Sequence, residues 1–135
     1  MIKVFYGKKG TGKTKLMLET ANALAKESNG TVVYIDDSNE LMMKLSHKIR
    51  FINILDYPVS GAEPFLGFLC GVASQNYDIE TAFIDGLTYI VHENPESLKT
   101  FFDGLEKISV EHNAHFYISI NGDENNTPDF IAKFI

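Results

Sequence analysis

The sequence predicts a three-layer α/β domain, in which a mainly parallel five-stranded sheet is flanked by helices. Two observations carry this prediction. Short apolar runs alternate with segments of helical periodicity along the whole chain, and this alternation is typical of βα units. The chain also shows no repeat, no low-complexity tract and no linker-like change of composition, so its 135 residues are expected to form a single domain, 1–135.

Five apolar runs are expected to form the strands of the sheet. They are short, and they alternate with segments that carry helix or turn signals. The predicted strands cover residues 2–6, 31–36, 51–55, 81–85 and 115–120.

Helical periodicity appears between these strands. A first helix is expected over residues 13–27, and Ser38 is placed to cap a second, short one. A third helix is expected over about residues 64–76, and it is apolar almost all round, which predicts that it is well covered. The clearest helix begins at Asn94 and Pro95.

Two further expectations concern small residues and the end of the chain. Gly67 and Gly71 would let the third helix approach the sheet closely, and Cys70 is interpreted as a buried, inert thiol. Residues 127–135 are interpreted as a short helix, with an edge strand as the alternative.

The composition argues against two classes of partner. A net charge of −6 is poorly suited to an extended nucleic-acid surface, which needs clustered lysine and arginine. No apolar run approaches the roughly 18 residues of a membrane span. The chain opens directly on a strand-like run, with no signal-peptide pattern, so the expected location is the cytoplasm.

The positive charge is concentrated in one short loop after the first predicted strand. The sequence "GKKGTGKT" satisfies the phosphate-loop pattern G-x-x-x-x-G-K-[ST], and it lies between a strand and a helix start, where the mechanism requires it. Glycines let successive backbone N–H groups converge on an anion, and the helix that follows presents its positive end. The predicted phosphate-binding residues are Gly7, Lys8, Lys9, Gly10, Thr11, Gly12, Lys13, Thr14 and Lys15.

Two residues are expected to hold Mg²⁺ beside this loop. The Thr14 hydroxyl would ligate the ion, and Lys13 would reach the β- and γ-phosphates. Asp85 ends the apolar run "TAFID", which suits an acidic residue that holds magnesium through water. An aspartate at the end of a strand is also a common turn former, so Asp85 depends on the loop for its interpretation.

Three segments resemble the RecA-like and KaiC-like ATPases of the P-loop NTPase fold. "TAFIDGLTYI" resembles their Walker B strand, "VVYIDDSNELMMKL" the segment after their second strand, and "HFYISIN" the strand that ends in a γ-phosphate sensor. The resemblance implies ATP and Mg²⁺ as cofactors and Asn121 as the sensor. It also implies, by analogy, a site that a homo-oligomer or another protein partner completes. The guanine-reading pattern N-K-x-D is missing from "NGDE", so adenine is expected.

The chain departs from this family at the residue that would activate water. Where the family has glutamate, this chain has Asp36 and Asp37, one methylene shorter, with Glu40 a turn later. These carboxylates are the catalytic candidates, because a carboxylate at a strand end can act as a base. The alternative interpretation is that Asp37 and Ser38 cap a helix. Nucleotide binding is therefore better supported than hydrolysis, and a nucleotide-binding regulatory module without turnover is the second hypothesis.

A second branch of P-loop proteins is also considered. "KKGTGKT" approaches the loop of ParA-like and MinD-like dimeric ATPases, in which a lysine at the position of Lys8 serves the partner's nucleotide, although Lys9 replaces their first glycine. The two branches predict different strand orders. A ParA-like sheet places the Asp85 strand next to the strand of the loop. A RecA-like sheet has the order 51–55, 31–36, 81–85, 115–120, 2–6.

Overall fold

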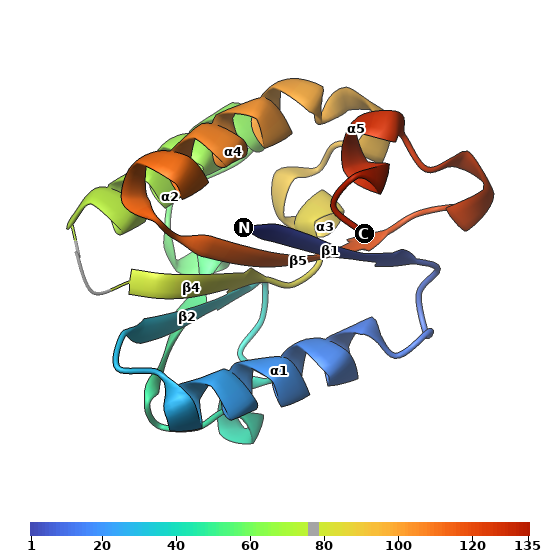
Figure 1. Ribbon diagram of the computed structural model, residues 1–135. Helices are drawn as coiled ribbons and strands as arrows, with labels where there is room; N and C mark the ends of the chain where they lie inside the picture. Colours follow the sequence, from blue (N-terminus) through green and yellow to red (C-terminus); the bar gives the residue numbers. More distant parts are fainter. Residues whose placement is uncertain (76–78) are drawn as a thin grey trace.

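The computed structural model describes residues 1–75 and 79–135, and within them the strands form one parallel five-stranded sheet (Figure 1). The sheet order is β1-β5-β4-β2-β3, and each neighbouring pair is parallel. In that order the strands are β1 (Ile2–Gly7), β5 (His115–Asn121), β4 (Ile79–Ile84), β2 (Thr31–Asp36) and β3 (Ile49–Asn53).

This order decides between the two topologies expected from the sequence. It is the RecA-like order, and β5 lies between β1 and β4. The ParA-like expectation, in which the Asp85 strand is adjacent to the strand of the loop, is therefore wrong. The predicted three-layer α/β fold is confirmed.

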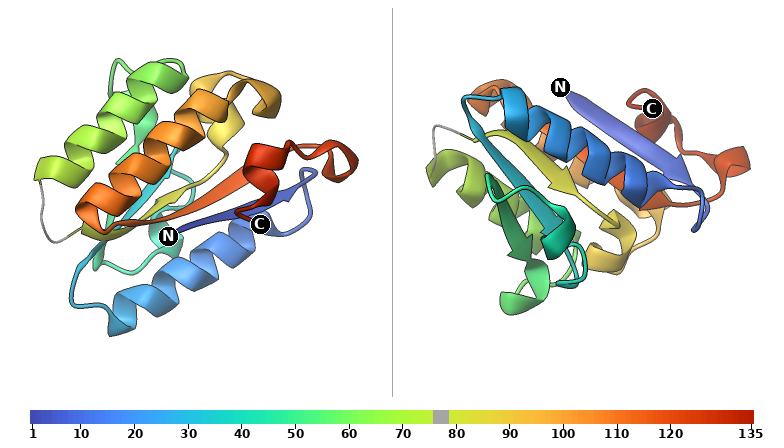
Figure 2. Two further views of the ribbon diagram at one scale, coloured as in Figure 1. Left: turned by 45° about the horizontal axis from the view of Figure 1, so that its top comes forward. Right: turned by 90° about the horizontal axis from the view of Figure 1, so that it is seen from below.

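Helices cover both faces of the sheet. α1 (Lys13–Glu27) packs on one face, and α2 (Ala62–Gln75) and α4 (Lys99–His112) pack side by side on the other (Figures 1 and 2). α3 (Leu87–Val91) and α5 (Asp129–Ala132) lie on the same side as α2 and α4. Because side chains alternate across a strand, the core divides into two apolar clusters, one under α1 and the larger one under the other helices.

Several predicted boundaries differ from the observed ones. β3 ends at Asn53, whose side chain accepts a hydrogen bond from the Leu55 N–H and begins a 3₁₀ turn over Ile54–Asp56. No α-helix follows Ser38. Its hydroxyl accepts the Glu40 N–H in a local turn, and a single 3₁₀ turn (Met42–Lys44) follows.

The fourth predicted helix begins later than expected. A 3₁₀ turn over Pro95–Ser97 precedes α4, which begins at Lys99. The sequence did not predict the five-residue helix α3. The last segment does form a helix, α5, as favoured, and its end bonds to the sheet edge, because the Val4 N–H donates to the Phe134 carbonyl at 2.9 Å.

The expectations for the small residues of α2 are wrong. Gly67, Cys70 and Gly71 are exposed, and no atom lies within 4 Å of a Cβ placed on either glycine. The helix instead buries Phe65 and Leu69 against the core. Small residues carry little information about which face is buried, so a helix that looks apolar all round still turns one side to water. The predicted end of this helix at residue 76 lies outside the described residues.

In the described part of the chain, no helix has the length and apolar character that crossing a bilayer requires.

Candidate functional site

The loop between β1 and α1 requires glycine at two positions, because of its backbone conformation. Gly10 and Gly12 have φ of +85° and +87°, in the left-handed region, where a side chain would be strained although the space around both positions is open. A Cβ on Gly7 would lie 2.7 Å from Oε1 of Glu124, but that oxygen ends a flexible, exposed side chain that can move aside. The loop backbone therefore follows a path that few other sequences can adopt.

Lys13 closes this loop on itself. Its Nζ donates to the carbonyl oxygens of Gly7 at 2.9 Å and Lys8 at 2.7 Å. Burial lowers the pKa of Lys13 below its usual range, while the negative charges of Asp85 and Glu124 oppose that shift. The ammonium group thus lies at the mouth of the loop among carbonyl groups that an anion could replace.

The beginning of α1 is electropositive. The helix starts at Lys13, and its first turn carries no acidic residue, although acidic side chains are generally favoured at that position. The first helical bond of this turn runs from the Leu16 N–H to the Gly12 carbonyl, which leaves earlier N–H groups without a helical acceptor. This is the arrangement by which helix N-termini bind anions.

Asp85 and Thr14 meet at the end of β4. Asp85 is only 7% exposed, and its Oδ1 accepts a hydrogen bond from the Thr14 hydroxyl at 3.3 Å. The same oxygen accepts from the Ser119 hydroxyl at 2.7 Å, and Oδ2 accepts from the Tyr34 hydroxyl at 2.6 Å. The structure therefore brings together the two residues that the sequence predicts to hold Mg²⁺, 71 positions apart in the chain.

Asp36 ends β2 beside Asp85. It is 8% exposed, and its Oδ1 accepts the backbone N–H of Asp37 at 2.8 Å. Burial, together with the nearby negative charges of Asp85 and Asp37, raises the pKa of Asp36 to about 7. A carboxyl group whose pKa lies near neutrality can both hold and accept a proton at physiological pH.

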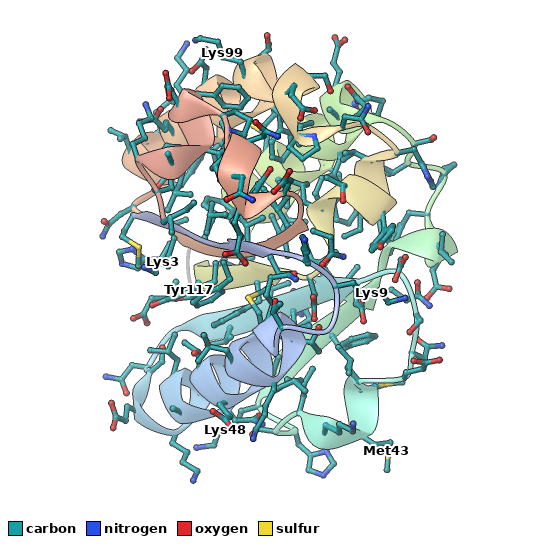
Figure 3. The ribbon with its side chains drawn as sticks, turned by 90° about the vertical axis from the view of Figure 1, so that its right-hand side faces the viewer. Lys3, Lys9, Met43, Lys48, Lys99 and Tyr117 are labelled. Carbon is teal, nitrogen blue, oxygen red and sulfur yellow. The ribbon has the colours of Figure 1, made fainter. Side chains whose placement is uncertain are left out.

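The predicted residues surround a cleft of about 630 Å³ at the carboxyl ends of the strands. Its walls include six of the nine predicted loop residues: Lys9, Gly10, Gly12, Lys13, Thr14 and Lys15. All the remaining candidates also line it: Asp36, Asp37, Glu40, Asp85 and Asn121. In Figure 3, Lys9 marks the loop on this side of the molecule, and Met43 marks the segment that follows β2.

Three predicted loop residues lie outside the cleft lining. Gly7 and Lys8 act through their carbonyl groups, which hold Lys13. Thr11 donates to the Lys8 carbonyl at 2.8 Å and lines a smaller hollow of about 310 Å³ on the other side of the loop. Arg50, the one arginine in the sequence, is exposed on β3 opposite Val33, three residues before the strand ends.

A row of stacked aromatic rings lies next to the site, on the face of the sheet that α1 covers. One ring comes from each strand, and neighbouring rings have centroids 4.7 to 6.4 Å apart. In sheet order the rings are those of Phe5, Tyr117, Phe83, Tyr34 and Phe51. Tyr117 is labelled in Figure 3, between the sheet and α1.

The polar residues of the site form the next row along the strands. Side chains two positions apart share a face, so the residue two positions after each ring lies on the same face as that ring. In sheet order these residues are Gly7, Ser119, Asp85, Asp36 and Asn53, of which Ser119, Asp85 and Asp36 line the cleft. The packed aromatic row thus positions the polar side chains that follow it along the strands.

Sequence reasoning missed several residues of the cleft, among them Ser119 and Tyr89, and it missed Tyr34, which is buried beside the cleft and bonds to Asp85. Tyr34 and Ser119 lie two positions before Asp36 and Asn121, so strand alternation places all four on one face. That periodicity was the available signal, although it does not reveal that both hydroxyls reach Asp85. Tyr89 enters the cleft from α3, which begins after Gly86 in the left-handed region at φ +77°.

The oxygen ligands present suit magnesium with few protein contacts. Among the described residues, no group of three or more histidine, cysteine, aspartate or glutamate side chains could hold a metal on its own. Thr14 and Asp85 supply a hydroxyl and a carboxylate beside a glycine loop. This donor set fits Mg²⁺, which usually keeps several waters and takes its other ligands from phosphate groups.

Comparisons with known proteins support the fold. No protein-family model matches the sequence, and no curated protein matches it. Among solved structures, the chain is similar to the flagellar accessory protein FlaH from Methanocaldococcus jannaschii, with a TM-score of 0.63 at 12% sequence identity. The match covers 98% of this chain and 65% of FlaH, so the chain spans slightly less than two thirds of that protein. At this identity the likeness concerns the fold alone.

Proposed function

We propose that this protein binds a nucleoside triphosphate with Mg²⁺, that ATP is the preferred nucleotide, and that slow hydrolysis makes it a switch or a small motor. One observation carries the proposal more than any other. The Thr14 hydroxyl and the Asp85 carboxylate meet at the edge of a glycine loop that also carries Lys13. A glycine-rich turn that binds no ligand would not be expected to have a buried carboxylate in contact with the first turn of the next helix.

Different residues of the cleft would bind the phosphate groups and the Mg²⁺ ion. The backbone of residues 8–14 and the start of α1 would hold the phosphate groups, and Lys13 would leave its carbonyl partners to meet the terminal phosphates. Thr14 and Asp85 would hold the Mg²⁺ ion, which neutralises phosphate charge when it is bound. Asn121, at the end of β5 and opposite Gly7 in the sheet register, would contact the γ-phosphate.

Asp36 and Asp37 are the groups proposed to orient water for hydrolysis. Both line the cleft, and the pKa of Asp36, raised to about 7, suits a base that works near neutral pH. By analogy with RecA-like proteins, a second copy or a protein partner would complete the site.

The second candidate is a module that binds the nucleotide without turning it over. It is favoured by the short side chains at the end of β2, because Asp36 already accepts the Asp37 N–H and reaches less far than a glutamate would. Steady-state phosphate release separates the two candidates, with Asp36→Ala, Asp37→Ala and Lys13→Ala compared with the wild type. Hydrolysis predicts that wild-type release exceeds that of Lys13→Ala and falls in at least one aspartate variant. Equal release from the wild type and Lys13→Ala would leave only the binding module.

A further inference from the structure

We propose that Tyr34 and Ser119 are positioning residues, whose hydroxyl groups hold the Asp85 carboxylate in the orientation that a Thr14-bound magnesium ion needs. This inference rests on the proposed function and adds to it two residues outside the phosphate loop.

The hydrogen-bond pattern fixes both oxygens of Asp85. Oδ2 has the Tyr34 hydroxyl at 2.6 Å, and Oδ1 has the Ser119 hydroxyl at 2.7 Å. The Ser119 oxygen in turn accepts the Gly86 N–H at 2.8 Å, so the serine proton points toward Asp85. An ionised carboxylate accepts hydrogen bonds only, and hydroxyl donors on both oxygens leave it no freedom to rotate without losing a partner.

Tyr34 is well suited to act as a permanent donor. Its side chain is fully buried, and its ring is stacked between Phe83 and Phe51, so the hydroxyl cannot swing away from Asp85.

The third hydroxyl contact of Asp85 is with Thr14. It is the longest of the three, and it involves the residue that would ligate the metal. The Thr14 hydroxyl lies 3.3 Å from Oδ1. A hydroxyl that ligates a cation through its oxygen points its O–H away from the cation and donates a hydrogen bond to an acceptor, and Oδ1 is in place to accept it. If Tyr34 or Ser119 is removed, the carboxylate is free to turn, and Thr14 loses a fixed acceptor.

The test measures the binding of a non-hydrolysable ATP analogue by calorimetry, once with excess MgCl₂ and once with EDTA. The dissociation constant in EDTA divided by the dissociation constant in MgCl₂ reports how much the metal strengthens binding. Partners that orient metal ligands typically contribute 10–100-fold to metal affinity, so Tyr34→Phe and Ser119→Ala are each expected to reduce this ratio about tenfold. Their affinity in EDTA is expected to stay within about twofold of the wild type, since the phosphate contacts are untouched.

Tyr117→Phe is the matched control. It removes a hydroxyl from the same aromatic row, two strands away from Tyr34, and Tyr117 is not among the three described hydroxyl donors to Asp85. Its ratio is expected to equal that of the wild type.

Each other outcome overturns the inference. An unchanged ratio in Tyr34→Phe and Ser119→Ala would show that the hydroxyls do not act on the metal. An equal loss of affinity in MgCl₂ and in EDTA would show a merely structural role. If Tyr34→Phe fails to fold, Ser119→Ala decides. Failure of the proposed function is distinguishable, because the wild type would then bind the analogue in neither solution.

Discussion

At the scale of single residues, the backbone of the loop and one buried carboxyl group are the unusual features of the site. Asp36 is a buried carboxyl group that lies close to other carboxyl groups, and Gly10 and Gly12 hold the loop in a left-handed conformation. The buried carboxyl group costs stability when it ionises, whereas glycine adopts the left-handed conformation without strain and other residues do not. Proteins commonly store costs of the first kind at functional sites.

Asp36→Asn is expected to stabilise the protein, and to do so more at pH 8 than at pH 5. The pKa of Asp36 is about 7 in the folded protein and close to the ordinary 3.8 in the unfolded chain. Stability is therefore lost as the pH rises from about 4 to about 7, because only the folded state resists ionisation. The asparagine keeps the acceptor for Asp37 and removes the charge, and a gain of roughly 1–3 kcal/mol is expected at pH 8.

Denaturant unfolding at the two pH values measures this difference. Asp56→Asn, at an exposed position, is the control and should change stability by less than about 0.5 kcal/mol at either pH. A gain for Asp36→Asn at pH 8 that is equal to or smaller than the gain at pH 5 would contradict the assignment.

Gly12→Ala is expected to destabilise the empty protein by about 1–2 kcal/mol, because alanine must then adopt a left-handed φ. It should also abolish phosphate binding. Gly67→Ala is the matched control, since this glycine lies inside α2 with open space around it, and alanine there should stabilise by about 0.5–1 kcal/mol. Equal effects at the two positions in urea unfolding would show that position 12 does not require a left-handed conformation.

At the scale of elements, the aromatic row explains how five strands present one polar row. Phe83 is buried at its centre, with Tyr117 and Tyr34 stacked on either side at 4.7 and 5.7 Å between ring centroids. Asp85 follows Phe83 on the same face of β4. The position of the carboxylate therefore depends on the packing of the ring below it.

Phe83→Ala is expected to cost about 3–5 kcal/mol of stability, as typical for a large buried ring. Val110→Ala, at a side chain 82% exposed on α4, should change stability by less than about 0.5 kcal/mol. Thermal and urea unfolding of both variants measure this contrast. A cost below about 1 kcal/mol for Phe83→Ala would argue against a rigid aromatic row.

The sequence predicts the elements that have a strong periodic or chemical signal. The five strands, α1 and the phosphate loop were all expected, because alternating apolar runs and the spacing of Gly7, Gly12 and Lys13 are local features. The sequence failed where distant contacts decide the outcome. α3 is only five residues long and begins after Gly86. The small residues of α2 give no signal that one side of this helix is exposed. The hydroxyl groups around Asp85 come from three different elements.

At the scale of the whole molecule, the carboxyl ends of the strands bring the separate motifs to one edge. Thr14, Asp36, Asp85 and Asn121 lie on or after four different strands, and the order β1-β5-β4-β2 places them side by side. In open parallel sheets, ligands bind at this edge. The topology therefore accounts for the gathering of the site without any single strong pairwise contact.

Binding of Mg²⁺ and ATP is expected to raise the unfolding temperature. At a ligand concentration of 100 times the dissociation constant, binding adds about 2.7 kcal/mol, which corresponds to roughly 5–15 °C for a domain of this size. The shift should be smaller with EDTA and absent in Lys13→Ala. A shift of the same size in Lys13→Ala would place the nucleotide somewhere other than this cleft.

Direct titration of ATP and GTP against the wild type and Lys13→Ala, with Mg²⁺ present, tests the central claim most directly. The account predicts saturable binding of ATP at one site per chain, weaker binding of GTP, and loss of binding in Lys13→Ala. No saturable binding of either nucleotide to the wild type, or a strict preference for GTP, would contradict it.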